Sequence, residues 1–230
     1  MKIIYRISDA GYSKVKPKYI NNRNCLWNAL NVFQEVGFDD WTIIADNVSE
    51  ETDVMIQGYV PRERIEYVSV GHGAGTFNLA LDKALTFDDN EIVYFIENDY
   101  LHLPNSKKVL EEGLNEIGAD FVSLYDHPDK YIDGANPYVQ GGGEMTRVML
   151  STSSHWKVTN STTMTFASKV KTLRKTENIL REYTQGSYPR DFDMFVHLYN
   201  SAHYLVTPIP GYSTHGETAW LTPLIDWSKI

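Results

Sequence analysis

Two carboxylates separated by a single residue, Glu97 and Asp99, close a short apolar run near the middle of the chain. The run, Ile92 to Ile96, is rich in β-branched and aromatic residues and too short for a buried helix, which favours a fully buried strand. Carboxylates at the end of a buried strand are costly unless a partner compensates their charge. A divalent cation with oxygen ligands, Mg²⁺ or Mn²⁺, would compensate it and also hold the phosphates of a substrate. The alternative is a polar turn that only ends the strand.

The elements that position these carboxylates alternate between strand and helix. Short apolar runs predict strands, and apolar residues at helical spacing predict helices. In the first half, strands are expected at 2–7, 41–45, 65–70 and 92–96, and helices at about 22–36, 49–56 and 76–85. This alternation is typical of βαβ units and of a mostly parallel, doubly wound sheet with helices on both faces.

Polar residues follow the first two strands as well. Ser8 comes after the first strand and Asp46 after the second, and Glu97-Asn98-Asp99 follows the central one. Because the carboxyl ends of parallel strands meet at one edge of a sheet, we expect these side chains to share a ligand site there.

The second half has a different pattern. Helices are expected at 107–117, 176–183 and 191–199, and strands at 120–124, 146–151, 159–166 and 204–207. The segments 146–151 and 159–166 alternate like strands of an antiparallel excursion. Because no internal repeat or linker is visible, the sequence predicts one domain over residues 1–230.

The bulk composition narrows the class of protein. The chain has 230 residues, 42% apolar and 22% charged, which is ordinary for a soluble globular protein. Its net charge of −9 does not attract nucleic acid through the overall field. A single cysteine, Cys25, excludes an internal disulfide, and no signal peptide is visible, so a cytoplasmic location is expected. No apolar run approaches the length of a membrane-spanning segment.

The order of the motifs resembles the GT-A-fold glycosyltransferases of the family 2 kind. The run Gly71 to Ala80 is similar to the family's Gly-containing turn and helix, where Asn78 matches the helix Asn and Phe77 departs from the usual Arg. Glu97-Asn98-Asp99 stands where the family has its D-x-D-like triplet, with Glu in place of the first Asp. Asp46 is similar to the Asp that holds the nucleotide base.

Two segments of the second half extend the resemblance. Arg190-Asp191-Phe192-Asp193 resembles the family's Glu-Asp-x-Asp motif, in which Asp191 matches the general base and Arg190 replaces the usual Glu. Tyr212 to Glu217 resembles the C-terminal segment whose His, here His215, completes metal binding. The resemblance covers residues 1–105 well and 150–217 loosely.

The resemblance implies a GT-A-like α/β fold, with a mostly parallel sheet flanked by helices and a smaller antiparallel acceptor-side portion. Residues 1–105 would bind the nucleotide sugar and 106–230 the acceptor. The implied activity is metal-dependent transfer of a hexosyl or pentosyl group, most simply from a UDP-sugar, to a hydroxyl of a carbohydrate or other acceptor, with inversion. The implied site residues are Asp191 as catalytic base, Asp99, His215 and Glu97 for Mn²⁺ or Mg²⁺, and Ser8, Asp46, Gly73, Asn78, Glu97, Asn98 and Asp99 for the donor.

Physical chemistry supports the same roles and leaves alternatives open. Charge builds on the leaving phosphate, and an acceptor hydroxyl needs a general base in the transition state. Asp191 could instead only cap a helix, with Asp193 as the fallback base.

A sugar nucleotidyltransferase would favour a Gly-rich basic loop after the first strand, whereas the segment 8–18 has three lysines and one glycine. A non-catalytic nucleotide- or carbohydrate-binding domain is the third hypothesis.

Overall fold

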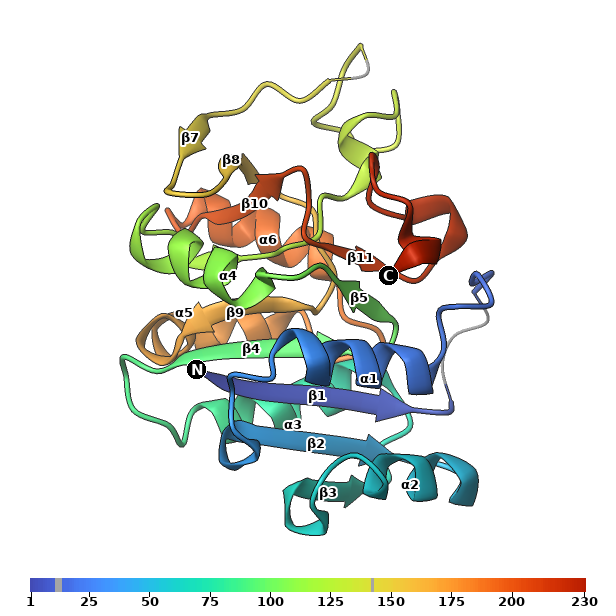
Figure 1. The fold of residues 1–230 in the computed structure, drawn as a ribbon. Coiled ribbons are helices and arrows are strands. Elements are labelled where there is room, and N and C mark those ends of the chain that lie inside the picture. The colour runs from blue at the N-terminus through green and yellow to red at the C-terminus, as the bar shows by residue number, and fades with distance from the viewer. Residues whose placement is uncertain (11–13, 142) are drawn as a thin grey trace.

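A single large sheet runs through the protein. The structure is a computed structural model that describes residues 1–10, 14–141 and 143–230. In these residues, nine strands form one sheet in the order β3-β2-β1-β4-β9-β6-β10-β8-β7, and β11 and β5 form a second, two-stranded sheet. Helices lie on both sides of the large sheet (Figure 1). The expected α/β class, a helix-flanked sheet with a smaller antiparallel portion, is confirmed.

The first half of the chain builds the parallel part of the sheet. Its strands are β1 (Lys2–Ser8), β2 (Trp41–Asp46), β3 (Ile65–Val68) and β4 (Ile92–Glu97), and every pairing among them is parallel. The helices that connect them are α1 (Asn22–Val32), α2 (Glu50–Gln57) and α3 (Gly73–Ala84). Each element lies within a few residues of the position that the sequence predicts, because the strands are short and mostly apolar.

Side chains that accept backbone N–H groups start these three helices. Asn21 accepts from the N–H of Asn24 at the start of α1, and Ser49 accepts from Thr52 at the start of α2. At the start of α3, the Nδ1 atom of His72 accepts from the N–H of Gly75. These bonds satisfy helix N–H groups that have no partner within the helix.

The second half adds strands of mixed direction. They are β6 (Phe121–Val122), β7 (Val148–Leu150), β8 (His155–Thr159), β9 (Phe166–Lys169) and β10 (Leu205–Ile209), with β9 antiparallel to both β4 and β6. The helices are α4 (Ser106–Asn115), α5 (Val170–Glu182) and α6 (Asp191–Asn200). The small sheet pairs β5 (Tyr100–His102) with β11 (Ser213–His215) in antiparallel fashion.

One expected strand, 159–166, is wrong. Residues 160–165 lie between β8 and β9 and belong to neither. Their hydroxyl groups bond elsewhere: Thr162 lies 2.7 Å from the hydroxyl of Ser123, and Thr163 donates to Glu97. The β-branched threonines that predict a strand therefore form side-chain hydrogen bonds instead.

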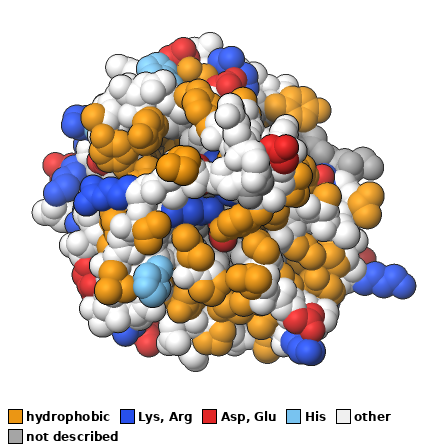
Figure 2. Space-filling model, turned by 90° about the horizontal axis from the view of Figure 1, so that it is seen from above, with side chains coloured by type: hydrophobic (Ala, Val, Ile, Leu, Met, Phe, Trp, Pro, Cys, Tyr) orange, Lys and Arg blue, Asp and Glu red, His pale blue; other side chains and the backbone are white. Residues whose placement is uncertain are grey.

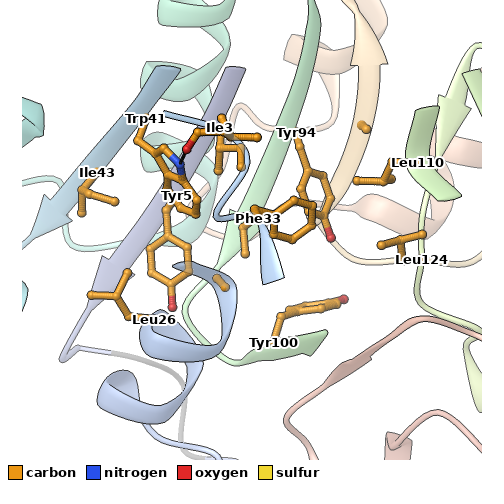
Figure 3. Packing of buried hydrophobic residues seen from close by; sticks show 14 of the residues in the cluster. Ile3, Tyr5, Leu26, Phe33, Trp41, Ile43, Tyr94, Tyr100, Leu110 and Leu124 are labelled. Carbon is orange, nitrogen blue, oxygen red and sulfur yellow. Dashed lines mark hydrogen bonds between the residues drawn. The ribbon is translucent and has the colours of Figure 1, made fainter. Parts of the chain in front are cut away.

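The core forms two layers, one on each face of the sheet. Because side chains alternate along a strand, Ile3 and Tyr5 of β1 face α1, while Ile4 packs on the opposite side with α3. Figure 3 shows the first layer, in which Phe33 of the α1 side lies against Tyr94 of β4. Each fully buried apolar side chain of this kind stabilises the fold by about 1.5–3 kcal/mol. The two layers hold the strand ends of the parallel half in fixed positions.

Among the helices of the described residues, none has the length and apolar character needed to cross a membrane.

Candidate active site

A cavity of about 590 Å³ opens at the carboxyl ends of β1, β2 and β4. Its size is in the range of small-molecule sites, roughly 300–1,000 Å³. The structure brings together there nearly all the residues that the sequence predicts for the site, from both halves of the chain. These are Ser8, Asp46, Gly73, Glu97, Asn98, Asp99, Asp191 and His215.

Asn98 fixes the turn after β4. Its Nδ2 atom donates to the carbonyl oxygen of Ser8, at 3.0 Å, and to Oδ1 of Asn22, at 2.6 Å. The turn is thereby tied to the end of β1 and to the start of α1. Asn98 and Ser8 consequently set the relative positions of the strand ends that surround the cavity.

Glu97 is held by an arginine on the neighbouring strand. Arg6 is directly opposite Glu97 in the β1–β4 register, and its Nη2 atom lies 3.4 Å from Oε1 of Glu97. The hydroxyl of Thr163 donates to Oε2 of Glu97 at 2.7 Å. Because side chains alternate along β4, Glu97 lies on the same face as Phe95, which packs with α3. Arg6 donates to Thr76 of α3. The charge of Glu97 is compensated there by protein groups.

Asp99 lies with one histidine and one lysine. Its Oδ2 atom is 3.3 Å from Nε2 of His215 and 2.9 Å from Nζ of Lys16. A second lysine, Lys14, has its Nζ 3.1 Å from Nε2 of His215. Burial raises the pKa of Asp99, but the facing charges of His215 and Lys16 outweigh this and hold its pKa well below the usual range. Asp99 is therefore an anion beside Lys16 and His215.

The small sheet places His215 beside Asp99. In the β5–β11 register His215 is paired with Tyr100, which directly follows Asp99 in the chain. The next residue, Gly216, passes so close that a Cβ atom there would lie 2.8 Å from the carbonyl oxygen of Asp99. This close approach requires a residue without a side chain.

The expected metal ligands do not all meet. In residues 1–10, 14–141 and 143–230, no group of three or more His, Cys, Asp or Glu side chains could hold a metal ion. Asp99 and His215 come together, whereas Glu97 is bonded to Arg6 and Thr163. The donor set therefore does not fit the three-residue site expected from the sequence, and the metal ion itself stays a prediction.

Asp191 enters the cavity from the start of α6. Arg190 takes the N-cap position, and Oδ1 of Asp191 accepts the N–H of Phe192 at 2.8 Å. Among the described residues, Oδ2 has no hydrogen-bond partner and is available to a ligand. Burial, reinforced by the negative charge of Glu97, raises the pKa of Asp191 to about 6.

Two further predicted residues have protein partners. The carboxylate of Asp46 accepts the N–H groups of Val70 at 2.7 Å and Gly71 at 2.8 Å, so it shapes the turn before α3. Asn78 does not line the cavity. Its side chain exchanges hydrogen bonds with Thr184 beyond the end of α5, because it lies more than a turn inside α3. The expectation that Asn78 contacts a donor has no support in this geometry.

Sequence reasoning missed several residues that line the cavity. Arg6 could have been recognised from the sequence, because it is a charged residue that interrupts the apolar run of the first strand. Asp9 accepts the N–H of Ser49 at 2.6 Å and so joins the loop after β1 to α2. Lys14 and Lys16 were visible as a basic loop, but nothing in the sequence placed them against Asp99 and His215.

The strand order and the position of the cavity define a GT-A-like α/β fold. Polar side chains gather where the parallel strands end, and a carboxylate of raised pKa completes the site from the second half of the chain.

Comparison with solved structures agrees with this class. The crystal structure of the 1–349 fragment of TarS from S. aureus matches with a TM-score of 0.53 and 13% identity, over 90% of this chain and 58% of that one. The same fragment in complex with UDP-GlcNAc matches with a TM-score of 0.50, 13% identity, and coverage of 90% and 56%. A CMP:2-keto-3-deoxy-manno-octonic acid synthetase complexed with CTP gives a TM-score of 0.49 at 11% identity, over 95% of this chain and 93% of that one.

The two TarS matches support the fold alone, because the identities are low. The chain spans less than two thirds of the TarS fragment. No protein-family model matches the chain, and no curated protein matches it by sequence.

Proposed function

We propose that this protein is a glycosyltransferase that moves a sugar from a nucleotide-diphosphate donor to an acceptor hydroxyl with inversion. The observation that carries the proposal is the position and pKa of Asp191. Its carboxylate shares one cavity with the ends of β1, β2 and β4, and its pKa is raised to about 6. Such a carboxylate is ionised at neutral pH yet more basic than an ordinary Asp, as a general base should be.

The reaction is a single displacement. The proton of the acceptor hydroxyl passes to Oδ2 of Asp191, while the acceptor oxygen forms a bond to the anomeric carbon of the sugar. The bond from that carbon to the diphosphate oxygen breaks at the same time, and the nucleoside diphosphate leaves with the electron pair. Attack from the side opposite the leaving group inverts the anomeric configuration. The ends of β1 and β2 would hold the nucleoside, as ligands in open α/β sheets lie at this edge.

UDP-sugars are the first donors to test. The support is at the level of the fold, because a TarS fragment of the same fold was solved with UDP-GlcNAc. The acceptor would be a carbohydrate or another hydroxyl-bearing molecule on the side of α6.

The test compares two aspartates of one helix. Asp191→Asn removes the base, whereas Asp193→Asn changes an exposed residue that lies 3.9 Å from Arg190 and outside the cavity. With a panel of nucleotide sugars and mixed acceptors, release of nucleoside diphosphate should fall about 10²–10⁴-fold in Asp191→Asn. It should stay near the parent level in Asp193→Asn. Binding of the diphosphate should persist in both variants.

Full transfer by Asp191→Asn would show that another group is the base. Release of pyrophosphate from a nucleoside triphosphate and a sugar phosphate would instead identify a nucleotidyltransferase. Nucleotide binding without either reaction would favour a binding domain.

A further inference from the structure

Two ammonium groups lie where the sequence predicts a metal ion. Nζ of Lys16 is 2.9 Å from Oδ2 of Asp99, the carboxylate expected to be the main ligand. Nζ of Lys14 is 3.1 Å from Nε2 of His215, the other expected ligand. Both lysines come from the loop after β1 and line the cavity.

The remaining predicted ligand is already compensated. Glu97 forms its ion pair with Arg6 and accepts from Thr163, so it has no need of a metal ion. Asp99 would offer a cation one carboxylate and His215 one nitrogen, and Oδ2 of Asp99 and Nε2 of His215 already lie 2.9 Å and 3.1 Å from lysine ammonium groups. The donor set is therefore poor for a divalent cation and well matched to lysine.

The charge of the two lysines also suits a diphosphate ligand. Two lysines carry the same formal charge as one divalent cation, and each ammonium offers three N–H donors to phosphate oxygens. Their side chains are 28% and 30% exposed, so N–H groups that do not face Asp99 and His215 can bond a ligand in the cavity. Asp99 and Glu217, which is 4.0 Å from Lys14, keep the pair in place before the ligand binds.

We propose that Lys14 and Lys16 bind the diphosphate of the donor and neutralise the leaving group, so that binding does not require a divalent metal ion. This inference rests on the proposed function for the nature of the ligand. Asp99 and His215 act as positioning residues that hold the two ammonium groups at the cavity wall. The developing charge on the leaving diphosphate is stabilised by N–H donors that are already in place.

The experiment measures binding of UDP, GDP, dTDP, ADP and inorganic pyrophosphate by calorimetry, with Mn²⁺ and with EDTA. One or more of these diphosphates should bind with equal affinity in both conditions. Lys16→Gln should weaken that binding by about tenfold to hundredfold, because a charge-assisted hydrogen bond is lost. Lys14→Gln should act in the same direction.

Lys18→Gln is the matched control. Lys18 belongs to the same loop, has the same charge and is exposed outside the cavity. Its replacement should leave the affinity unchanged. The corresponding nucleoside, which lacks phosphate, should bind equally well to the parent and to Lys16→Gln.

Each other outcome overturns a defined statement. Diphosphate binding that requires Mn²⁺, or that survives in both Lys14→Gln and Lys16→Gln, overturns the lysine assignment and leaves the proposed function standing. Binding of pyrophosphate in EDTA without binding of any nucleotide supports phosphate binding by Lys14 and Lys16 and contradicts a nucleotide-diphosphate donor. Absence of binding by every probe in both conditions overturns both.

Discussion

At the scale of single residues, the basicity of each carboxylate in the cavity depends on the charged groups beside it. Lys16 and His215 lower the pKa of Asp99, whereas desolvation and the nearby charge of Glu97 raise the pKa of Asp191 to about 6. Two carboxylates in one cavity therefore differ in basicity, and only the more basic one suits proton abstraction.

The pH dependence of transfer should follow Asp191. A base must be deprotonated to accept the acceptor proton, so the rate should rise with pH through about 6 and reach a plateau above 7. At pH 5 the rate should be about tenfold below the plateau, since one pH unit below a pKa leaves roughly a tenth of the base ionised. A profile of kcat/KM from pH 5 to 8 measures this. A flat profile would contradict the assignment of Asp191.

Asp191 should also reduce stability at neutral pH. Its pKa is raised from 3.8 to about 6 in the folded state, so the folded protein binds the proton more tightly than the unfolded chain does. Stability is therefore lost as pH rises from about 4 to 6, and the loss is complete above that window. Asp191→Asn should be more stable than the parent at pH 7.5 by about 1–3 kcal/mol.

Urea unfolding at pH 4 and pH 7.5 tests this difference. The gain of Asp191→Asn should shrink at pH 4, where the parent side chain is protonated in the folded protein. The exposed Asp193→Asn should show no such pH dependence. Equal stability of Asp191→Asn and parent at pH 7.5 would argue against a buried, destabilised carboxylate.

At the scale of elements, short segments position the reactive groups. Ser8, Asp46 and Asp99 could be predicted because each lies at the end of a mostly apolar strand, and parallel strand ends share an edge. The pairing of Glu97 with Arg6 could not be predicted. It depends on the register between β1 and β4, which brings together residues far apart in the sequence. The small sheet could not be predicted either, because β5 and β11 are three-residue strands without an apolar pattern.

The approach of β11 to the turn after β4 gives a prediction at Gly216. A Cβ atom there would lie 2.4 Å from Cγ2 of Ile20 and 2.8 Å from the carbonyl oxygen of Asp99. Gly216→Ala must therefore displace the backbone on one side, which should cost about 1–3 kcal/mol and weaken diphosphate binding. Gly37→Ala is the control, because nothing lies within 4 Å of a Cβ atom at that position. Calorimetric unfolding of both variants makes the comparison, and equal stability would contradict the close contact.

Buried ion pairs attach the segment after β6 to β8. Nζ of Lys157 lies 2.9 Å from Oδ1 of Asp126, and both side chains are 3% exposed. Lys157→Met should destabilise the protein by about 3–5 kcal/mol, because it leaves a buried carboxylate without its partner. Lys83→Met, which breaks the exposed pair with Glu66, should cost no more than about 1 kcal/mol. Chemical denaturation distinguishes the two, and similar small losses would show that Asp126 finds another partner.

At the scale of the whole molecule, the cavity holds a local group of cations that the net charge does not reveal. The net charge is −9 and five carboxylates line the cavity, yet Arg6, Lys14 and Lys16 line it as well. The net charge of the whole chain does not favour nucleic acid, but a small anionic ligand interacts with the local groups. The face of the molecule seen in Figure 2 carries many hydrophobic side chains. Met145, Val148 and Leu150, in and just before β7, have exposed side chains.

The continuity of the sheet leads to a prediction about unfolding. Strand β9 from the second half pairs with β4 from the first, and residues of both halves line the cavity. The two halves should therefore unfold together, in one calorimetric transition, as expected for the single domain over residues 1–230. A diphosphate at about 100 times its Kd should add about 2.7 kcal/mol and raise the Tm of that whole transition by several degrees. Two transitions, of which the ligand shifts only one, would show that the halves are independent units and that the site belongs to one of them.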